Sequence, residues 1–421
     1  MKMKSTHRRK SRLDSIELFS GAGGLALGTA MAGFHHAALF EIDATARKTL
    51  TLNQKVSRRR GISSWTLFGD DVRKTDFSVF APLDLLAGGS PCQPFSHAGK
   101  RRGRMDRRDM IPEFVRAVRE IQPKAFILEN VRGLANSKFA DYLDYVKLQL
   151  SYPHDSPARR ENWRSHHARL KRQALRGSID ATYNVVSKVV NAADYGVPQQ
   201  RQRLFIVGLR VDLGVTWEFP APTHSLDALL YDQYVTGKYW RRHGIGRREV
   251  PEMFRRRVES LNKRPRGRPW FTVRDALADL PSPRKGGRDT PGYHNHRGRP
   301  GARTYPGHLG SDCDLPSKTL KAGRHGVAGG ENVVCWPNGT HRYYTIREAA
   351  RLQTFPDSWR FVGNWVDLIR QIGNAVPPKL AMIVGRSVAK ALKRASSMPI
   401  SRLNNRHSTR RKVPALLRRA A

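Results

Sequence analysis

A cysteine between two prolines is the feature of this sequence with the clearest chemical potential. The segment Gly-Gly-Ser-Pro-Cys-Gln-Pro-Phe-Ser places Cys92 between Pro91 and Pro94. Proline fixes φ and the glycine pair permits a tight turn, so we expect a rigid, exposed loop after a short apolar segment. Structural cysteines usually lie inside apolar elements and are inert, whereas an exposed loop cysteine near cations is reactive. Cys92 is therefore a candidate nucleophile.

A glycine-rich turn and two acidic positions indicate an adenosyl ligand. The turn Phe19-Ser-Gly21-Ala-Gly23-Gly lies between a predicted strand and a predicted helix, where the backbone can approach a ligand at the helix N-terminus. Glu41 follows a second predicted strand about twenty residues on, where an acid can hold ribose hydroxyls. Asp70 and Asp71 follow a third segment, where a carboxylate can accept a hydrogen bond from an adenine amino group. Positions of this kind at successive strand ends predict an adenosyl cofactor pocket.

Further motifs carry a resemblance to a known family. After the Pro-Cys loop the chain contains, in order, Glu129-Asn-Val, Gln199-Gln-Arg-Gln-Arg, Thr345-Ile-Arg-Glu with Arg-Leu-Gln-Thr-Phe-Pro behind it, and Gln371-Ile-Gly-Asn-Ala-Val-Pro. This set resembles the DNA cytosine-5 methyltransferase family, whose nucleophile lies in such a Pro-Cys loop. Residues 100–114 resemble the segment behind that loop, although Asp109 stands where the family commonly has glycine or asparagine. The resemblance covers about residues 14–394.

The resemblance implies a role for each candidate residue. Cys92 is expected to be the nucleophile, and Glu129 to hydrogen-bond N3 and the exocyclic amine of cytosine. Arg203, with Arg201, is expected to hold O2 and to orient Glu129. The implied methyl donor is S-adenosyl-L-methionine and the implied substrate is double-stranded DNA. Contacts with the cofactor are expected from Phe19, Gly21, Gly23, Glu41, Ile42, Asp71, Pro91, Ile111, Asn374 and Val376.

The chemistry explains why these residue types are needed. C5 of cytosine is a poor nucleophile, so a thiolate at Cys92 must add to C6 and push electrons into the ring. A protonated carboxyl at Glu129 offsets the charge that develops at N3. The resulting enamine attacks the methyl donor, and a base then removes the C5 proton so that the thiolate leaves. The sequence does not identify that base. The reaction is impossible inside a stacked duplex, so the cytosine must be flipped out.

Alternating strands and helices are predicted to position these residues. Apolar runs predict strands at 16–19, 37–42, 84–87, 125–128 and 204–209. Helical periodicity predicts helices at 24–33, 44–53, 111–121, 345–353 and 378–394. Such alternation implies an α/β fold with a doubly wound, mostly parallel sheet covered on both faces. The family resemblance implies the Rossmann-like variant found in S-adenosylmethionine-dependent methyltransferases.

The composition predicts a division into domains. The alternation stops near Pro220, and the chain from there to about residue 340 is rich in Arg, Gly, Pro, His and aromatic residues. We expect a smaller, loop-rich target recognition domain at this place. The predicted boundaries are a basic disordered arm (1–13), a catalytic and cofactor-binding domain (14–220, with an insertion at about 151–176), the recognition domain (221–340), a return to the catalytic domain (341–394) and a basic tail (395–421).

The net charge points to a nucleic acid partner. The chain has 76 Lys and Arg against 35 Asp and Glu, which gives a formal charge of +41. A phosphate backbone rewards such an excess through counterion release. The three cysteines form no C-x-x-C pair, which argues against a disulfide scaffold or a zinc ribbon and for a reducing cytosol, and we expect no metal site. No apolar run is long enough to span a bilayer. We expect a monomeric, cytoplasmic, nucleoid-associated enzyme, with or without a separately acting cognate restriction endonuclease.

Rival functions share parts of this pattern. A tRNA cytosine methyltransferase has the same scaffold, but the large region between Pro220 and Thr345 favours an enzyme that reads DNA sequence. A non-catalytic DNA-binding relative would be expected to lose Cys92, Glu129 or Asn374, and all three are present. A redox enzyme with a Rossmann fold does not explain the Glu-Asn-Val motif or the closing motif, Gln371-Ile-Gly-Asn-Ala-Val-Pro.

Overall fold

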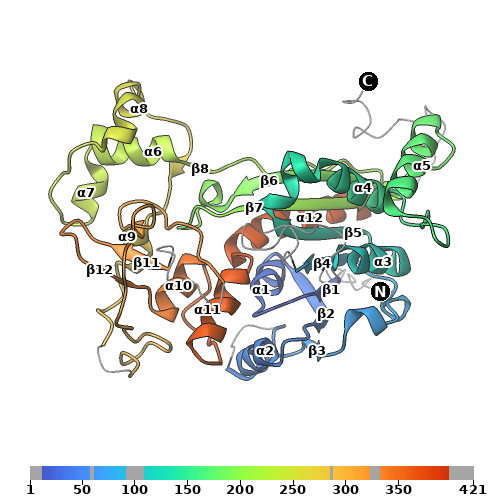
Figure 1. Ribbon diagram of the computed structural model, residues 1–421, viewed down its shortest axis with the longest axis horizontal. Helices are drawn as coiled ribbons and strands as arrows, with labels where there is room; N and C mark the ends of the chain where they lie inside the picture. The colour runs from blue at the N-terminus through green and yellow to red at the C-terminus, as the bar shows by residue number, and fades with distance from the viewer. Residues whose placement is uncertain (1–11, 57–60, 92–108, 285–287, 323–331, 398–421) are drawn as a thin grey trace, which may run out of the picture.

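The central element of the fold is a seven-stranded sheet with strand order β3-β2-β1-β4-β5-β7-β6 (Figure 1). The computed structural model describes residues 12–56, 61–91, 109–284, 288–322 and 332–397. The strands are β1 (Leu13–Leu18), β2 (Phe34–Phe40), β3 (Thr66–Phe68), β4 (Leu85–Gly89), β5 (Ala125–Val131), β6 (Tyr183–Asn191) and β7 (Gln202–Arg210). Neighbouring strands are parallel except at β7, which is antiparallel to β5 and to β6. The prediction of a mostly parallel sheet is confirmed.

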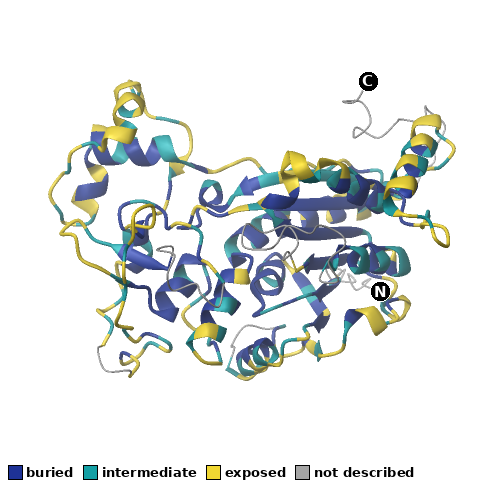
Figure 2. Ribbon diagram, viewed as in Figure 1, coloured by how far each residue is buried: buried dark blue, intermediate teal, exposed yellow. Residues whose placement is uncertain are grey.

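Helices cover both faces of this sheet, whose strands are buried throughout the centre (Figure 2). Leu86 and Phe126 belong to an apolar cluster on one face, and their neighbours Leu85 and Ile127 belong to a cluster on the other. This alternation follows from the two-residue period of a strand. The helices that contribute are α3 (Ile111–Ile121) and α4 (Ala140–Ser151) on the first face, and α1 (Gly24–Met31) and α12 (Pro378–Ser396) on the second.

Two further helices flank the sheet. They are α2 (Ala44–Val56) beside β2 and β3, and α5 (Trp163–Arg176) beyond α4 (Figure 1). The close packing of α1 on α12 depends on a glycine, because a Cβ at Gly28 would lie 2.4 Å from that of Ala381. The last described helix is thereby packed directly against the first one.

A second group of elements lies beside the sheet, on the left in Figure 1. It consists of β8 (His224–Ser225), α6 (Leu226–Leu230), α7 (Lys238–Arg242), α8 (Arg255–Glu259), β9 (Arg268–Pro269), α9 (Val273–Leu277), β10 (Ser311–Asp312), β11 (Val333–Cys335) and β12 (His341–Tyr343). Leu229, Tyr239 and Trp240 are fully buried in a separate apolar cluster of this group. The elements are short and the connections long, as the composition predicts.

The chain then returns to the sheet through α10 (Ile346–Leu352) and α11 (Trp365–Asn374). Helix α10 begins at a capping box in which the Thr345 side chain accepts from the Glu348 N–H and the Glu348 carboxylate accepts from the Thr345 N–H. The helices predicted at 345–353 and 378–394 are thus present within two residues of their expected ends. Among the described residues, none of the helices combines the length and apolar composition needed to cross a bilayer.

Candidate active site

A cavity of about 350 Å³ lies at the carboxyl ends of β1, β4 and β5. This is the edge at which open parallel sheets usually bind ligands. The predicted site residues that line the cavity are Phe19, Gly21, Glu41, Pro91, Glu129, Arg201, Arg203, Asn374 and Val376. Cys92 lies outside the described residues, and Pro91, the residue before it, is in the cavity wall.

The glycine-rich turn forms one wall of the cavity. Its backbone has positive φ at Phe19 (59°), Gly21 (53°) and Gly23 (85°), a conformation that glycine adopts without strain and phenylalanine rarely does. The turn is tied down by the Gly21 N–H, which donates to Oε2 of Glu41 at 2.6 Å. A Cβ at Gly24 would lie 2.3 Å from the carbonyl oxygen of Val376, so the turn also lies directly against the closing motif.

Glu41 is a fixed acceptor at the end of β2. Its second oxygen accepts from the Asp43 N–H at 2.7 Å, and Arg47 donates to the backbone carbonyls of Glu41 and Ile42. Burial raises the pKa of Glu41, and the hydrogen bonds from Asp43 and Gly21 oppose that rise. Each carboxylate oxygen has two lone pairs, so Glu41 keeps acceptor capacity toward the cavity.

Glu129 and Arg203 form a buried ion pair across two neighbouring strands. Glu129 lies near the end of β5, where it pairs with Gly89 of β4 and Phe205 of β7. Its Oε1 is 3.2 Å from Nε of Arg203, and the carboxyl side chain is only 8% exposed. Burial raises the pKa of Glu129, while Arg203 and then Arg201 lower it. The net rise favours the protonated carboxyl, which is a hydrogen-bond donor as well as an acceptor.

Arg201 joins two motifs that are far apart in the sequence. Its guanidinium is fully buried, and Nη2 donates to the carbonyls of Gly373 (2.7 Å) and Ala375 (2.9 Å). Gln353 donates to the same segment, at the carbonyl of Ile372. The closing motif is thereby held against β7 and contributes Asn374 and Val376 to the cavity.

The comparisons with known proteins agree with this geometry. A family model described as C-5 cytosine-specific DNA methylase matches residues 13–152 and 163–390, which is most of the chain. The chain belongs to this family. The predicted resemblance is confirmed, and the protein is a DNA (cytosine-5-)-methyltransferase. The tRNA methyltransferase alternative is set aside because the matching family is one of DNA methylases.

Several relatives are named type II methyltransferases, as in restriction-modification systems. M.PspPI of Psychrobacter sp. (strain TA137) is 34% identical over 397 residues, covering 90% of this chain and 80% of the relative. M.NgoMIV of Neisseria gonorrhoeae is 33% identical over 390 residues, covering 90% and 98%. The solved structure of S. pombe Dnmt2 methyltransferase matches with a TM-score of 0.52 at 18% identity, covering 91% of this chain and 99% of that one. At that identity the structure supports the fold alone.

Some residues predicted to contact the cofactor in this methyltransferase do not line the cavity. Gly23 lies within the turn, Ile111 is buried at the start of α3, and Ile42 is 66% exposed. Asp71 accepts from the backbone N–H and the guanidinium of Arg73, and these hydrogen bonds lower the pKa of Asp71 to about 2. The cofactor contacts of these four residues stay predictions.

Other cavity residues were not among the predicted ones. Glu17 is fully buried on β1, lines the cavity, and its Oε2 has no hydrogen-bond partner among the described residues. An acid inside the otherwise apolar segment Ile-Glu-Leu-Phe is the signal that marks it in the sequence. Asn130 donates to Oγ of Ser90 at 2.8 Å and so fixes the position of Ser90, which precedes Pro91 in the cavity wall.

The methyltransferase also accommodates its departure from the family pattern at Asp109. One carboxylate oxygen of Asp109 accepts from the N–H of Ile111 at 3.0 Å, and the other accepts from the Tyr142 hydroxyl. The side chain therefore anchors the start of α3 and ties it to α4.

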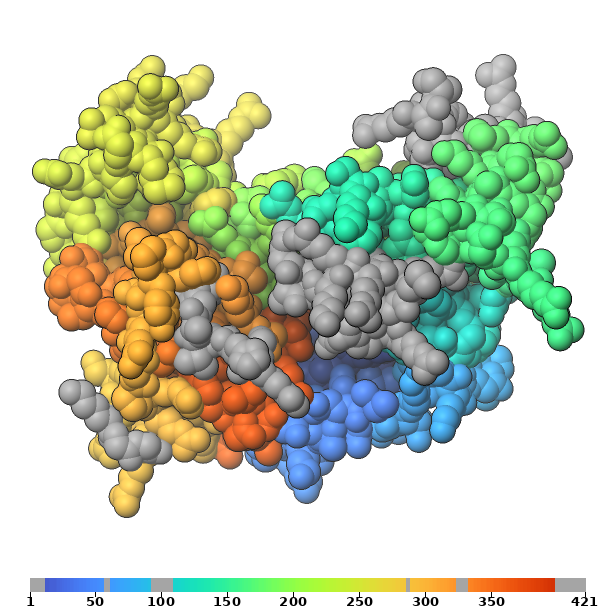
Figure 3. Space-filling view, viewed as in Figure 1, coloured from blue at the N-terminus to red at the C-terminus, as the bar shows by residue number. Residues whose placement is uncertain are grey.

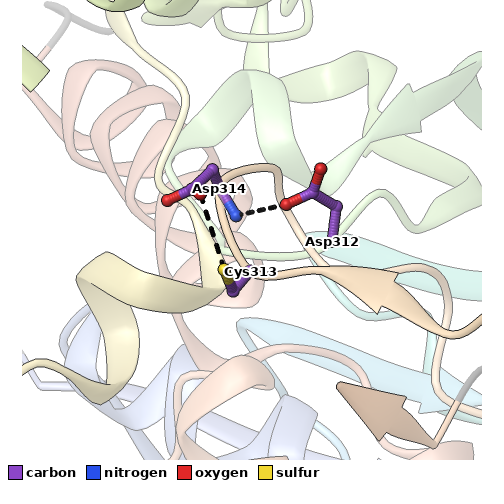
Figure 4. A group of neighbouring side chains, drawn as sticks. All are labelled: Asp312, Cys313 and Asp314. Carbon is purple, nitrogen blue, oxygen red and sulfur yellow. Dashed lines mark hydrogen bonds between the residues drawn. The ribbon is translucent and has the colours of Figure 1, made fainter. Parts of the chain in front are cut away.

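A cluster of Asp312, Cys313 and Asp314 offers metal-type ligand atoms outside the cavity (Figure 4). The carboxylate of Asp314 is already held by Arg274 (2.6 Å), Arg248 (2.6 Å) and the Tyr239 hydroxyl (2.8 Å). Burial raises the pKa of Cys313 to about 12, which keeps it a thiol. Because two arginines and a tyrosine hydroxyl already engage the Asp314 carboxylate, these contacts indicate a packing role for the cluster.

Proposed function

We propose that this enzyme transfers a methyl group from S-adenosyl-L-methionine to C5 of a flipped-out cytosine, through a covalent adduct of Cys92. The observation that carries the proposal is that one cavity joins the glycine-rich turn, the Glu129–Arg203 pair and Pro91. Cys92 is the next residue after Pro91. Three features thus meet at one edge of the sheet. They are a cofactor site, a carboxyl group able to protonate a cytosine ring, and the residue that precedes the nucleophile.

The donor atoms around the cavity fit S-adenosyl-L-methionine. The cavity volume of about 350 Å³ lies within the range of about 300–1,000 Å³ that small-molecule sites occupy. Glu41 offers acceptors for ribose hydroxyls, and Glu17 offers a buried, unpartnered carboxyl oxygen as an acceptor for the cationic amino group of the methionine part. When bound, the cofactor supplies an electrophilic methyl group. We therefore assign Phe19, Gly21, Glu17, Glu41, Asn374 and Val376 to its binding.

Glu129 supplies the proton-donating group that the cytosine ring needs. Because burial raises its pKa, Glu129 carries a proton at higher pH than an exposed glutamate does. The protonated carboxyl donates to N3 as electrons move into the ring, and Arg203 fixes its orientation at 3.2 Å. Arg201 acts through the backbone of the closing motif, to which it donates two hydrogen bonds.

The covalent step belongs to Cys92. Its thiolate forms a bond to C6, and the C5–C6 π electrons move toward C5, which becomes the nucleophile toward the methyl group. After methylation, the proton on C5 leaves to a base, the C5–C6 double bond re-forms, the S–C6 bond breaks and the proton on N3 returns to Glu129. The cytosine must be out of the base stack for each of these steps, which requires base flipping.

We assign the choice of DNA sequence to residues 221–340. Among the described residues, those lining the cavity all come from other parts of the chain. The region also carries exposed cations, including Arg241, Arg255 and Arg256, which suit contacts with phosphates. The monomeric state and a separately acting restriction endonuclease stay predictions.

A duplex that contains 5-fluorocytosine in place of cytosine tests the covalent step. After methylation, C5 of the adduct carries fluorine instead of hydrogen, and fluorine does not leave as a cation. The S–C6 bond therefore persists, and we expect a complex that survives sodium dodecyl sulfate and forms only with the cofactor present. Peptide mapping should locate the adduct at Cys92.

The other cysteines provide the matched control. Cys335→Ser should trap the duplex as the native enzyme does, and Cys92→Ser should not trap it. Efficient methylation of ordinary DNA without any trapped complex on the fluorinated duplex would contradict the covalent mechanism.

A further inference from the structure

The end of α4, residues 153–162 and α5 form a corner of the molecule that lies outside the catalytic cavity. The family model stops at residue 152 and resumes at residue 163, so the loop before α5 lies outside the match. Helix α5 itself contains no acidic residue. In Figures 1 and 3 it forms a projection at the right-hand end of the molecule, opposite the elements β8 to β12.

The inner face of α5 is firmly attached. Leu170 and Ala174 pack into an apolar cluster with α4, and His166 is hydrogen-bonded to the Tyr145 hydroxyl at 2.7 Å. Arg169 pairs with Asp155 (2.8 Å) and with Glu161 (2.9 Å). His167 is 2.9 Å from a carboxylate oxygen of Asp144. These acids are therefore engaged with the inner side of the helix.

The outer face is a stripe of uncompensated cations. Arg164, Arg172 and Arg176 are exposed and follow helical spacing along one broad side of α5, and Arg159 and Arg160 are exposed in the preceding loop. Within the described part of the chain, none of these five arginines forms an ion pair. At a rise of about 1.5 Å per residue, the stripe from Arg164 to Arg176 is about 18 Å long.

We propose that this stripe, Arg159, Arg160 and the outer face of α5, binds the phosphate backbone of duplex DNA as a second contact outside the catalytic cavity. Duplex DNA presents about one negative charge per 1.7 Å of axis, so about 18 Å of duplex offers on the order of ten phosphates. A guanidinium matches a phosphate with paired hydrogen bonds and stays charged at every physiological pH. The inference rests on the proposed function only in that DNA is the substrate.

The stripe is suited to hold DNA without reading its sequence. Between the arginines the outer face also carries Ala168 and the 52% exposed Leu175, whose side chains have no hydrogen-bonding groups. Contacts to phosphates alone are independent of sequence. The stripe therefore adds affinity for any duplex and keeps the enzyme on DNA between target sites.

Binding to a duplex that has no cytosine isolates this contact from the active site. The variant R164Q/R172Q/R176Q and the native enzyme are titrated with an alternating dA·dT duplex of about 40 base pairs over a range of salt concentrations. The slope of log K against log salt is negative, and we expect its magnitude to decrease by about 0.9 for each lost phosphate contact, up to about 2.7. The matched control K48Q/K55Q/K74Q removes the same charge from exposed positions near α2 and β3 and should change the slope by less than about 0.9.

The outcomes separate this contact from the proposed chemistry. The α5 variant should methylate saturating cytosine-containing DNA within about twofold of the native rate, because no residue of the stripe lines the cavity. An unchanged salt slope, or an equal decrease in both variants, would overturn the proposal. A decrease seen with duplex RNA but not with duplex DNA would overturn it as well.

If the triple variant unfolds at a lower temperature than the native enzyme, the loop variant R159Q/R160Q tests the phosphate contact instead. This variant leaves α5 intact and should decrease the magnitude of the slope by about 1.8 on the same duplex. A slope equal to that of the native enzyme would overturn the proposal.

Discussion

Replacing Glu129 by glutamine separates the chemical use of this carboxyl from its effect on stability. Glutamine has the same shape and keeps hydrogen-bonding capacity, but it cannot deliver a proton to N3. General acid catalysis is worth about 10²–10⁴ in rate, or about 2.7–5.4 kcal/mol of activation free energy. We therefore expect Glu129→Gln to slow methyl transfer by that factor at saturating DNA and cofactor.

The same substitution should not destabilise the fold at neutral or higher pH. In the native protein the pKa of Glu129 is raised, so the folded state holds this proton more tightly than the unfolded state does. Its contribution to stability is fully present below the unfolded pKa and is lost as pH rises through the folded pKa, by about 1.4 kcal/mol for each pKa unit of difference. Glutamine stays neutral, so the free energy of unfolding of the variant should increase relative to that of the native protein as pH rises.

Two assays measure these effects on the same preparations. Single-turnover transfer of a tritiated methyl group gives the chemical rate, and thermal unfolding at several pH values gives the relative stability. Glu17→Gln is the matched control, because Glu17 is also fully buried in the cavity wall with its pKa raised by burial. It should show the same pH trend in stability and a raised KM for the cofactor, with a nearly native rate at saturation. A native rate for Glu129→Gln, or its marked destabilisation at pH 8, would refute this reasoning.

Other predictions follow from the same contacts. Arg201→Ala removes two buried hydrogen bonds to the closing motif and should lower the free energy of unfolding by about 3–5 kcal/mol in urea titrations. A loss below about 1 kcal/mol would contradict a stabilising role for these two hydrogen bonds. Exchanging residues 221–340 with those of a relative should move methylation, read by bisulfite sequencing, to the relative's site; persistence of the original site would contradict the assignment. Deleting residues 1–12 and 398–421, which leaves α12 complete, should flatten the salt dependence of DNA binding without changing the methylated sequence; an altered site would contradict a purely electrostatic role.

The strands that the sequence predicted share a simple property. Their central residues are mostly apolar and are buried on both faces, as in the segment Ala-Phe-Ile-Leu of β5. Strand β6 was not predicted, because Asn184, Ser187 and Lys188 interrupt its apolar residues at the exposed edge of the sheet. Strand β3 has only three residues, which is too short for any period to show.

The site could be predicted where a motif is local and not where it depends on tertiary contacts. The turn at Phe19 and the acid at Glu41 are neighbours because adjacent parallel strands end at the same edge, which the alternation implies. The partners of Arg201 lie more than 170 residues away, at Gly373 and Ala375, and no spacing rule connects them. Asp71 is held by Arg73, two residues on, and a competing local contact of this kind is not evident from the pattern.

The most direct test of the account is to replace Cys92 by glycine and to measure chemistry and binding on the same DNA. Glycine removes the thiolate, so methyl transfer should fall by orders of magnitude. The contacts assigned to Glu129, Arg203 and the cofactor residues remain, and the smaller side chain leaves more room for an extrahelical base. Binding in a gel-shift titration should therefore be as tight as that of the native enzyme or tighter. Appreciable methyl transfer by Cys92→Gly would exclude Cys92 as the nucleophile and contradict the mechanism.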